Sequence, residues 1–501
     1  MLLLGIDIGT SSIKVSVVDS ATGKILASAQ HPEAEAAIIA PQTGWAEQSP
    51  EAWWEDVKQA VLKCHTSEAY DPMDIAAIGL AYQMHGLVLV DKDQHVLRNS
   101  IIWCDSRAVE TGNKAFTAIG EEHCLRRLLN SPGNFTAAKM AWVKENEPAV
   151  YERTDKLMLP GDFIAMKLTG DITTTISALS EGIFWDFEEN NISVDVKRYF
   201  GFDDKLFPVV HPLFSPHGYL KGSVAARLNL KQGIPIAYKS GDQPNNALAL
   251  NVLEPGQVAA TAGTSGVIYA VSDQLACDLQ SRVNSFAHVN YTPASIRTGI
   301  LLCINGAGIF NRWIKQVCGS QLSYAAINEA ASAVKPGSDG LFALPFGNGA
   351  ERMLNNRMVG AHFNGLDLNH HGAAHLFRAV QEGIAFSFRY GLDIMRENGV
   401  TPDIVRAGKS NLFLSNVFTQ SFVNASGLAV EFYEGDGSYG AAIGAGIGAG
   451  IYSSAADAGS QRKPLELIEP SNEDLYDEFY QQWKTLLEEK LKKEQVNELI
   501  S

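Results

Sequence analysis

The stretch GIDIGTSSIK, residues 5–14, decides the fold, because its triplet Gly-Thr-Ser returns in TAGTSGVIY, residues 261–269. In both places the triplet stands between two β-type runs: LLLGIDIG and SIKVSVVD first, QVAATAG and GVIYAVSD later. A short polar turn between two such runs predicts a β-hairpin. The two triplets are separated by about half of the 501-residue chain. The sequence therefore predicts a duplicated unit, with one copy in each half.

The length of the chain also favours two domains. A chain of 54.3 kDa exceeds what one hydrophobic core usually supports. We expect domains over 1–243 and 244–501, divided within GIPIAYKSGDQPNN. Strand-like and helix-like segments alternate along the chain, which indicates a mixed α/β architecture. A terminal helix is expected from residue 471, with a core-facing stripe of apolar residues spaced four apart: Leu475, Phe479, Trp483 and Leu487.

Charge and composition exclude several classes of function. Forty basic against 56 acidic residues give a net charge of −16, which argues against unspecific binding to nucleic acid or an anionic membrane. The six cysteines lack C-x-x-C spacing, so neither a disulfide framework nor a cysteine zinc site is predicted. The first residues, MLLLGIDIG, have no basic segment before the apolar run, and no run of eighteen apolar residues follows. We expect a cytoplasmic protein with no membrane partner.

Two aspartates need a reason for their positions. Asp7 lies in an otherwise apolar strand, where an unpaired carboxylate pays a large desolvation cost. It either caps the adjacent turn or holds a hydrated Mg²⁺, which prefers oxygen ligands. Asp242 follows the strand IPIAY and precedes Pro244. This position suits a helix N-cap and equally a catalytic base, since both place a carboxylate at the carboxyl end of a strand.

Together the two hairpins and the two aspartates predict a nucleotide site. The turns supply backbone N–H groups and hydroxyls that suit phosphate oxygens, as anion-binding nests do. One aspartate precedes each turn, so a cleft between the two halves would hold Mg²⁺ and ATP and close over them.

Two glycine motifs suggest other nucleotide folds. AGKS, residues 407–410, ends like a phosphate-binding P-loop, but Asp403 stands where the first glycine is required, so we reject it. GDGSYG, residues 435–440, fits a dinucleotide fingerprint between a strand and a helix. Only about sixty residues follow it, too few to complete a doubly wound domain. The motif and its context nevertheless keep an NAD-dependent dehydrogenase that uses GDGSYG as an alternative.

A set of motifs extends over nearly the whole chain: GWAEQSPEAWWED, YQMHGLVLVD, IIWCDSR, SGDQPNNALAL, AGTSGVIYAVSD and GSYGAAIGAG. On these motifs the chain resembles the FGGY carbohydrate kinases, and the xylulose kinases among them. The resemblance covers nearly the whole length. It implies two actin-like, ribonuclease-H-like domains related by duplication, with the active site in the cleft between them. It also implies ATP-dependent phosphorylation of a ketose, with D-xylulose giving D-xylulose 5-phosphate as the first expectation.

The resemblance also implies roles for individual residues. Asp242 matches the general base, and Asp7 matches the magnesium-associated aspartate, with Asp242 contributing to the metal site. Three groups of further positions follow: the phosphate loops Gly9, Thr10 and Ser11, with Lys14, and Gly263, Thr264 and Ser265; the sugar side Met84, His85, Trp103, Asp105, Arg107 and Asp242; and the nucleotide side Gly306, Gly408 and Asn411.

The chain departs from the family pattern on the nucleotide side. It reads RAGKSN where many members carry a glycine run, so Arg406 and Ala407 are expected to reshape the adenosine pocket, and Leu414 replaces a tryptophan. The alternatives that stay open are a kinase for ribulose, gluconate, L-xylulose or another polyol, the dehydrogenase, and an ATP-gated scaffold of the actin type. The expected partners are the sugar and ATP, and a homodimer stays open.

Overall fold

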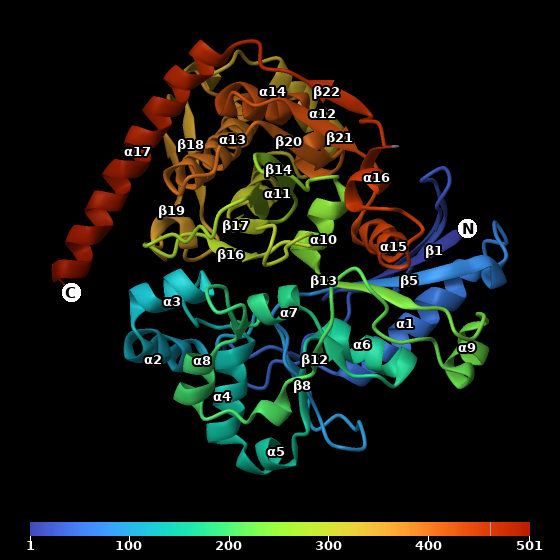
Figure 1. Ribbon diagram of the computed structural model, residues 1–501. Coiled ribbons are helices and arrows are strands. Elements are labelled where there is room, and N and C mark those ends of the chain that lie inside the picture. The colour runs from blue at the N-terminus through green and yellow to red at the C-terminus, as the bar shows by residue number, and fades with distance from the viewer. Residues whose placement is uncertain (461, 501) are drawn as a thin grey trace.

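The computed structural model describes residues 1–460 and 462–500, which form two α/β halves stacked on one another (Figure 1). The N-terminal half, blue to green, lies below the C-terminal half, yellow to red. Each half is built on its own β-sheet, and the helices α10 (Asp242–Ala249) and α15 (Gly437–Gly448) lie where the two halves meet. This is the predicted architecture of two α/β domains.

The N-terminal sheet is mixed and has the order β13-β5-β1-β2-β3. The first strand is antiparallel to the second and parallel to β5, which in turn is parallel to β13. The turn after β1 carries the first Gly-Thr-Ser triplet, so the predicted hairpin is present. The strands are β1 (Leu2–Ile8), β2 (Ile13–Asp19), β3 (Ile25–His31), β5 (Ile75–Tyr82) and β13 (Ile236–Gly241).

The C-terminal sheet repeats this arrangement and adds a strand at each edge. Its order is β16-β17-β15-β14-β20-β21-β22, with β14 antiparallel to β15 and parallel to β20. The central five strands therefore correspond one by one to those of the N-terminal sheet, which explains why the triplet recurs. The strands are β14 (Gln257–Ala262), β15 (Gly266–Ser272), β16 (Asn284–Ala287), β17 (Thr298–Ile304), β20 (Ile404–Gly408), β21 (Val430–Tyr433) and β22 (Glu466–Ile468).

Helices lie at matching places in the two halves. α1 (Pro50–His65) joins β3 to β5, and α13 (Ala373–Glu397) joins β17 to β20. The hydroxyl of Ser49 accepts the Ala52 N–H and caps the start of α1. Other helices are α2 (Val109–Ile119), α3 (Glu121–Leu128), α4 (Thr136–Asn146), α6 (Pro160–Thr169), α7 (Ile176–Glu181), α11 (Ala307–Cys318), α12 (Tyr324–Ser332), α14 (Asn416–Ser426) and α17 (Glu473–Ile500).

Helix α15 of the C-terminal half packs on the sheet of the N-terminal half. α15 contacts β1, β5 and β13, and its glycines and alanines allow this close approach. A Cβ on Gly5 would lie 1.8 Å from the Ser438 carbonyl oxygen, and a Cβ on Gly79 would lie 1.9 Å from that of Ala441. Glycine is therefore required at both sheet positions, and the motif GDGSYG begins a helix that joins the two domains.

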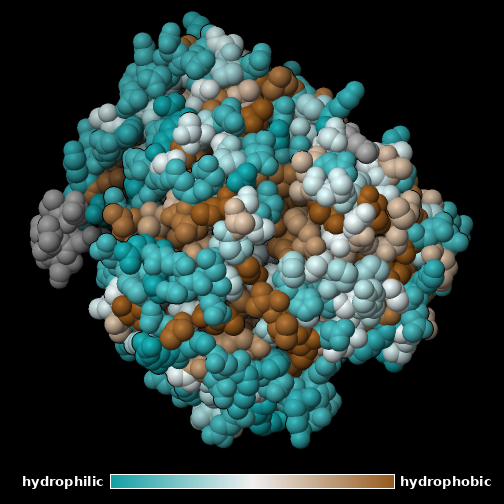
Figure 2. Space-filling model, in the orientation of Figure 1, coloured by the Kyte–Doolittle hydropathy of each residue, from teal (hydrophilic) through white to brown (hydrophobic). Residues whose placement is uncertain are grey.

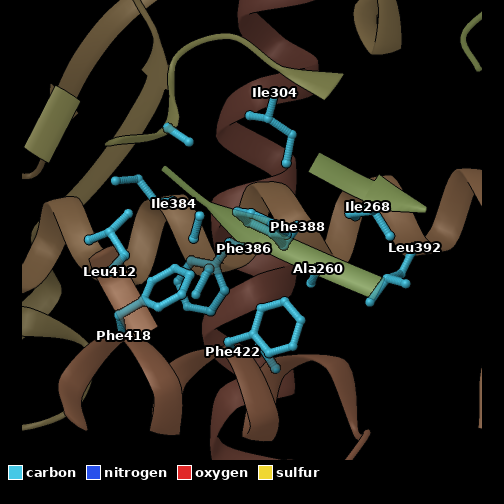
Figure 3. Packing of buried hydrophobic residues seen from close by; sticks show 14 of the residues in the cluster. Ala260, Ile268, Ile304, Ile384, Phe386, Phe388, Leu392, Leu412, Phe418 and Phe422 are labelled. Atoms are coloured by element: carbon cyan, nitrogen blue, oxygen red, sulfur yellow. The ribbon is translucent and has the colours of Figure 1, made fainter. Parts of the chain in front are cut away.

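The core of the C-terminal half is formed by α13 between the sheet and α14. In Figure 3, Phe388 of α13 lies near Phe422 of α14, with ring centroids 5.5 Å apart, and Ile268 of the sheet lies close by. Complete burial of one such aromatic side chain contributes about 1.5–3 kcal/mol. On the face shown in Figure 2, apolar side chains also gather along the junction between the two halves.

The apolar stripe of α17 differs from the expected one. Trp483 and Leu487 are fully buried as expected, but Leu475 is 41 % exposed, and Tyr476 and Tyr480 are buried in its place. Residues spaced four apart drift around a helix that has 3.6 residues per turn. In the first turns of α17 the buried positions are therefore Tyr476 and Tyr480, each one residue after the expected Leu475 and Phe479. No helix in the described part of the chain is long and apolar enough to cross a membrane.

Candidate active site

The predicted catalytic groups meet at one edge of the N-terminal sheet. β1, β5 and β13 are parallel neighbours, so their carboxyl ends lie together. Asp7 is the penultimate residue of β1, Met84 and His85 follow the end of β5, and Asp242 directly follows β13. The carboxyl ends of parallel strands are where α/β proteins commonly bind ligands.

The two aspartates perturb one another. Burial, followed by the negative charge of Asp7, raises the pKa of Asp242 from 3.8 to about 7. Burial also raises the pKa of Asp7 to about 6, against the attraction of Lys14, its cross-strand partner. A third carboxylate, Asp436 at the start of α15, raises the pKa of Asp7 further. A general base with a pKa near neutrality is well placed to accept a proton at neutral pH.

This carboxylate pair fits a magnesium ion. Both side chains are half-buried, and their charges are not balanced by a salt bridge among the described residues. Carboxylate oxygens are the ligands that Mg²⁺ prefers, and a dication would remove the mutual repulsion that raises the two pKa values. Asp7 and Asp242 are therefore suited to hold the ion, directly or through its water shell.

The first hairpin is held by residues from three of the sequence motifs. Gln48 Nε2 donates to the Thr10 carbonyl oxygen at 2.7 Å, and Thr10 Oγ1 donates to Gln83 Oε1 at 3.3 Å. Gln83 Nε2 in turn donates to Gln48 Oε1, and Trp103 Nε1 donates to Thr10 Oγ1 at 2.9 Å. The motifs WAEQ, QMHG and W-DSR thus fix the loop that is predicted to bind phosphate.

Asp105 and Arg107 form a buried brace beside this network. The Arg107 guanidinium lies 2.7 Å from the Asp105 carboxylate and 2.8 Å from that of Glu47. It also lies over the Trp45 ring, 3.8 Å from its centroid, and the Asp105 carboxylate accepts the Ala46 N–H. Both side chains are thereby committed to contacts within the protein. Their assignment to substrate binding stays a prediction, and their visible role is to hold the segment that carries Trp103.

His85 is neutral and presents one nitrogen to the site. Burial, followed by the charge of Lys139, lowers its pKa to about 3. Its Nδ1 lies 2.9 Å from the Glu181 carbonyl oxygen, which can only accept, so Nδ1 carries the proton and Nε2 is left as an acceptor. His85 also has a left-handed backbone with φ of 62°, which turns the chain sharply after β5. An acceptor in this position matches the O–H donor of a sugar.

Three further ionisable residues lie near His85 and Asp242 and were not found from the sequence. Glu181 is buried, and burial raises the pKa of its carboxyl well above 4.5. Its Oε2 lies against Gly241, next to Asp242. Lys139 is also buried; it donates to the carbonyl oxygens of His85 and Ile102, and burial lowers its pKa to about 7.

The third of these residues, Arg352, comes from the C-terminal half. Burial lowers the pKa of its guanidinium. Its positive charge acts on His85 and also on Cys303 of β17, whose thiol senses the charge of Asp242 as well. Residues of the C-terminal domain therefore lie near His85 and Asp242. The sequence signal for Glu181 was one acidic residue in the otherwise uncharged run ITTTISALSEGIFW, and the signal for Arg352 was the motif GAERM.

The second hairpin lines a cavity of about 450 Å³ in the C-terminal half. Gly263, Thr264 and Asn411, all predicted for nucleotide binding, are among its lining residues. The start of α11 packs against this hairpin, because a Cβ on Gly308 would lie 2.0 Å from the Gly263 carbonyl oxygen, and Ile309 N–H donates to Thr264. The volume lies within the range of small-molecule and cofactor pockets.

Gly306 lies at a neighbouring cavity of about 290 Å³ that shares Ile309 with the first. Its N–H, like that of Asn305, donates to the buried carboxylate of Glu351, which belongs to the motif GAERM. Burial raises the pKa of Glu351 to about 7. The loop before α11 is thereby tied to the segment that delivers Arg352.

The altered residues of the adenosine motif lie apart from the larger cavity. Arg406 turns to Glu431, with Nε and Oε2 2.8 Å apart, and Ala407 is fully buried in the sheet. Leu414, which stands where the family has a tryptophan, does line the cavity. Of the three residues that depart from the family pattern, Leu414 and not Arg406 or Ala407 therefore shapes this cavity. Gly408 ends β20, close to the turn that carries Asn411.

The start of α15 is closed to a dinucleotide. The Asp436 carboxylate accepts the N–H groups of Ser438 and Tyr439, which a pyrophosphate would need. GDGSYG is thus a helix cap and a packing motif, which removes the observation behind the dehydrogenase alternative.

Comparison with known families decides the class of protein. The N-terminal domain of the FGGY family of carbohydrate kinases matches residues 2–249, and its C-terminal domain matches residues 258–449. The chain belongs to the FGGY family of carbohydrate kinases. The resemblance seen in the motifs is confirmed, and the protein is a sugar kinase by family rather than a dehydrogenase or a scaffold.

Curated relatives of this FGGY kinase match over most of its length. It is 28 % identical to a xylulose kinase of Klebsiella pneumoniae over 93 % of each chain. It is 29 % identical to a xylulose kinase of Lactococcus lactis, covering 96 % of this chain and 95 % of that protein.

Solved structures share the fold. The xylulose kinase of Rhodospirillum rubrum matches with a TM-score of 0.86 at 24 % identity, over 97 % of this chain and 98 % of that one. A gluconate kinase of Lactobacillus acidophilus matches with a TM-score of 0.88 at 19 % identity, over 98 % of both chains. The predicted two-domain fold is thereby confirmed.

Proposed function

We propose that this FGGY kinase transfers the γ-phosphoryl group of ATP to a ketose, with D-xylulose as the preferred acceptor. The observation that carries the proposal is the position of Asp242, with a pKa of about 7, beside Asp7 at the strand edge where Met84 and His85 emerge. The xylulose kinases among its relatives support xylulose over other acceptors.

In this mechanism the protein positions its substrates and moves one proton. Asp242 accepts the proton of the attacking sugar hydroxyl, and His85 Nε2 accepts a hydrogen bond from another hydroxyl of the same sugar. The N–H groups of Thr10 and Ser11 and those at Gly263–Ser265 hold phosphate oxygens, while the Gly9 N–H donates to the Ser12 carbonyl oxygen within the turn. Asp7 and Asp242 would hold Mg²⁺, which would supply positive charge against the charge that develops on the transferred phosphoryl group.

The adenosine end of ATP is assigned to the cavity of about 450 Å³. It combines backbone groups at Gly263 and Thr264 with the side chains of Asn411 and Leu414. The nucleotide would thus lie in the C-terminal half and extend its phosphates toward Asp242. Gly306, Gly408 and Lys14 are proposed to contribute to nucleotide binding as well.

An assay of sugar-dependent ADP release tests the proposal. The panel comprises D-xylulose, L-xylulose, D-ribulose, L-ribulose, gluconate and glycerol, each with ATP and Mg²⁺. The highest kcat/KM is expected for D-xylulose, because a pocket that hydrogen-bonds hydroxyls rejects a sugar that leaves a buried polar group unpaired. If kcat/KM is higher for gluconate or glycerol, that compound and not D-xylulose is the acceptor. If none of the six compounds stimulates ADP release, the assignment to a ketose is wrong.

A further inference from the structure

A cluster of histidines around one carboxylate lies outside the active site. Asp339 precedes β18 (Phe342–Phe346), and His370, His371 and His375 surround the start of α13. β18 packs along α13 in the C-terminal half (Figure 1), which brings the two segments together. The three imidazole rings lie with centroids 5.2–5.5 Å apart. Phosphoryl transfer has no evident use for such a group.

The geometry of the cluster suits a transition-metal ion. His375 Nε2 lies 3.3 Å from Asp339 Oδ2, and His370 Nε2 lies 3.6 Å from the same oxygen. All three ligand atoms lie within 4.8 Å of one another. A tetrahedral zinc ion with bonds of about 2.1 Å places its ligand atoms about 3.4 Å apart. The site therefore requires only a small contraction to accept the ion.

We propose that Asp339, His370 and His375 bind one Zn²⁺ or a similar divalent transition-metal ion. Two imidazoles and one carboxylate supply three of four tetrahedral positions, and water supplies the last because Asp339 and His370 are exposed. Imidazole ligands favour this class of ion over Mg²⁺, which prefers oxygen. The site is thus chemically distinct from the magnesium site at Asp7 and Asp242.

The neighbouring contacts show what binding would change. His375 Nδ1 accepts the Gly372 N–H, so the neutral ring carries its proton on Nε2 and points it at Asp339. The ion would take the place of this proton, and the ring proton would move to Nδ1. The Gly372 N–H then bonds to solvent, since this residue is exposed. His371 Nε2 lies 3.3 Å from the Asp339 carbonyl oxygen and steadies the loop without acting as a ligand.

A second group of possible ligands does not share these features. Asp91, Asp93 and His95 also lie within 4.8 Å of one another. The Asp91 carboxylate, however, already accepts the backbone N–H groups of Asp93 and His95, as in a polar turn. Among the described side chains, Asp339 by contrast contacts only imidazole rings through its carboxylate. The turn at Asp91 therefore serves as a control.

The bound ion would tie the start of β18 to the first turn of α13. Asp339 has a left-handed backbone with φ of 52°, in a loop whose neighbour Ser338 is held by buried Glu382 of α13. An ion that bridges the two segments binds the folded chain but not the dispersed ligands of the unfolded chain. It should therefore raise the thermal midpoint of unfolding.

The experiment is a Zn²⁺ titration of the tag-free full-length protein against a chromophoric chelator, in excess Mg²⁺ and without ATP. One equivalent of Zn²⁺ is expected to bind. His370→Ala should weaken it by about 100-fold or more, the upper value for loss of an outer hydrogen-bond partner of a metal ligand. His370 is suited to this test because its ring is exposed, so the variant keeps the fold. His95→Ala should bind Zn²⁺ like the unmodified protein.

Thermal unfolding gives a second measurement that does not depend on kinase activity. Zn²⁺ should raise the midpoint of the unmodified protein and of His95→Ala, and leave that of His370→Ala unchanged. Sub-stoichiometric binding, binding that survives His370→Ala, or binding lost in His95→Ala would each overturn the site. If the exposed thiols of Cys104 and Cys303 held the Zn²⁺ instead, binding would survive His370→Ala.

Discussion

Activity of the kinase should fall on acidification because of one carboxyl group. Burial and the charge of Asp7 raise the pKa of Asp242 from 3.8 to about 7. A general base acts only in its ionised form, and below its pKa that fraction falls about tenfold for each pH unit. We therefore expect kcat/KM to be about 100-fold lower at pH 5 than on its plateau above pH 8. The assay is ADP release with sugar and MgATP both below KM, which reports the free enzyme.

Asp7→Asn separates the two causes of this shift. The substitution removes a negative charge that disfavours ionisation of Asp242. The acid limb of the pH profile of kcat/KM should therefore move to lower pH, although the plateau of kcat/KM also falls. Part of the rise remains, because burial is the larger cause. Asp19→Asn, at the far exposed end of β2, is the control and should keep the limb in place. A profile that is flat from pH 5 to 8, or one that does not shift in Asp7→Asn, would refute the coupling of these two carboxylates.

Three substitutions and one control substitution test other parts of the account. Trp103→Phe removes one hydrogen bond to the first hairpin and should lower kcat/KM for ATP by about 2- to 12-fold, measured by ADP release; an unchanged value would remove Trp103 from this role. Gly79→Ala places a Cβ 1.9 Å from the Ala441 carbonyl oxygen and should lower the free energy of unfolding in urea by about 1–3 kcal/mol or more. Gly372→Ala, whose added Cβ meets open space, should leave the free energy of unfolding nearly unchanged. Glu181→Gln should keep KM for the sugar near its original value because burial disfavours the charged carboxylate and the amide has nearly the same shape, whereas a large rise in KM would show that a negative charge is used.

The sequence predicted those parts of the protein that depend on local pattern. A Gly-Thr-Ser turn between two β-type runs predicts a hairpin wherever it occurs, and its repetition predicted two related domains. Asp7 and Asp242 could be found because an acidic residue at the end of an apolar strand needs a partner or a function. The strand order then brings both to the same edge of the sheet.

The remaining parts depend on tertiary contacts that no local pattern encodes. Glu181 and Lys139 reach the pocket from helices α7 and α4, and Arg352 reaches it from the other domain. Asp105 and Arg107 follow Trp103 in one motif, yet they pair with one another and with Glu47, which only the folded chain shows. The apolar stripe of α17 was misplaced for a similar reason, since a spacing of four gives a face but not its angle to the sheet.

The central claim is that Asp242 removes the proton from the sugar hydroxyl, and Asp242→Asn tests it most directly. The amide keeps the size of the side chain but cannot accept the proton. We expect kcat to fall about 100- to 10,000-fold, while the Kd of the sugar, measured by titration calorimetry, stays nearly unchanged. An unaltered kcat, or a loss of activity explained entirely by weaker sugar binding, would contradict the account.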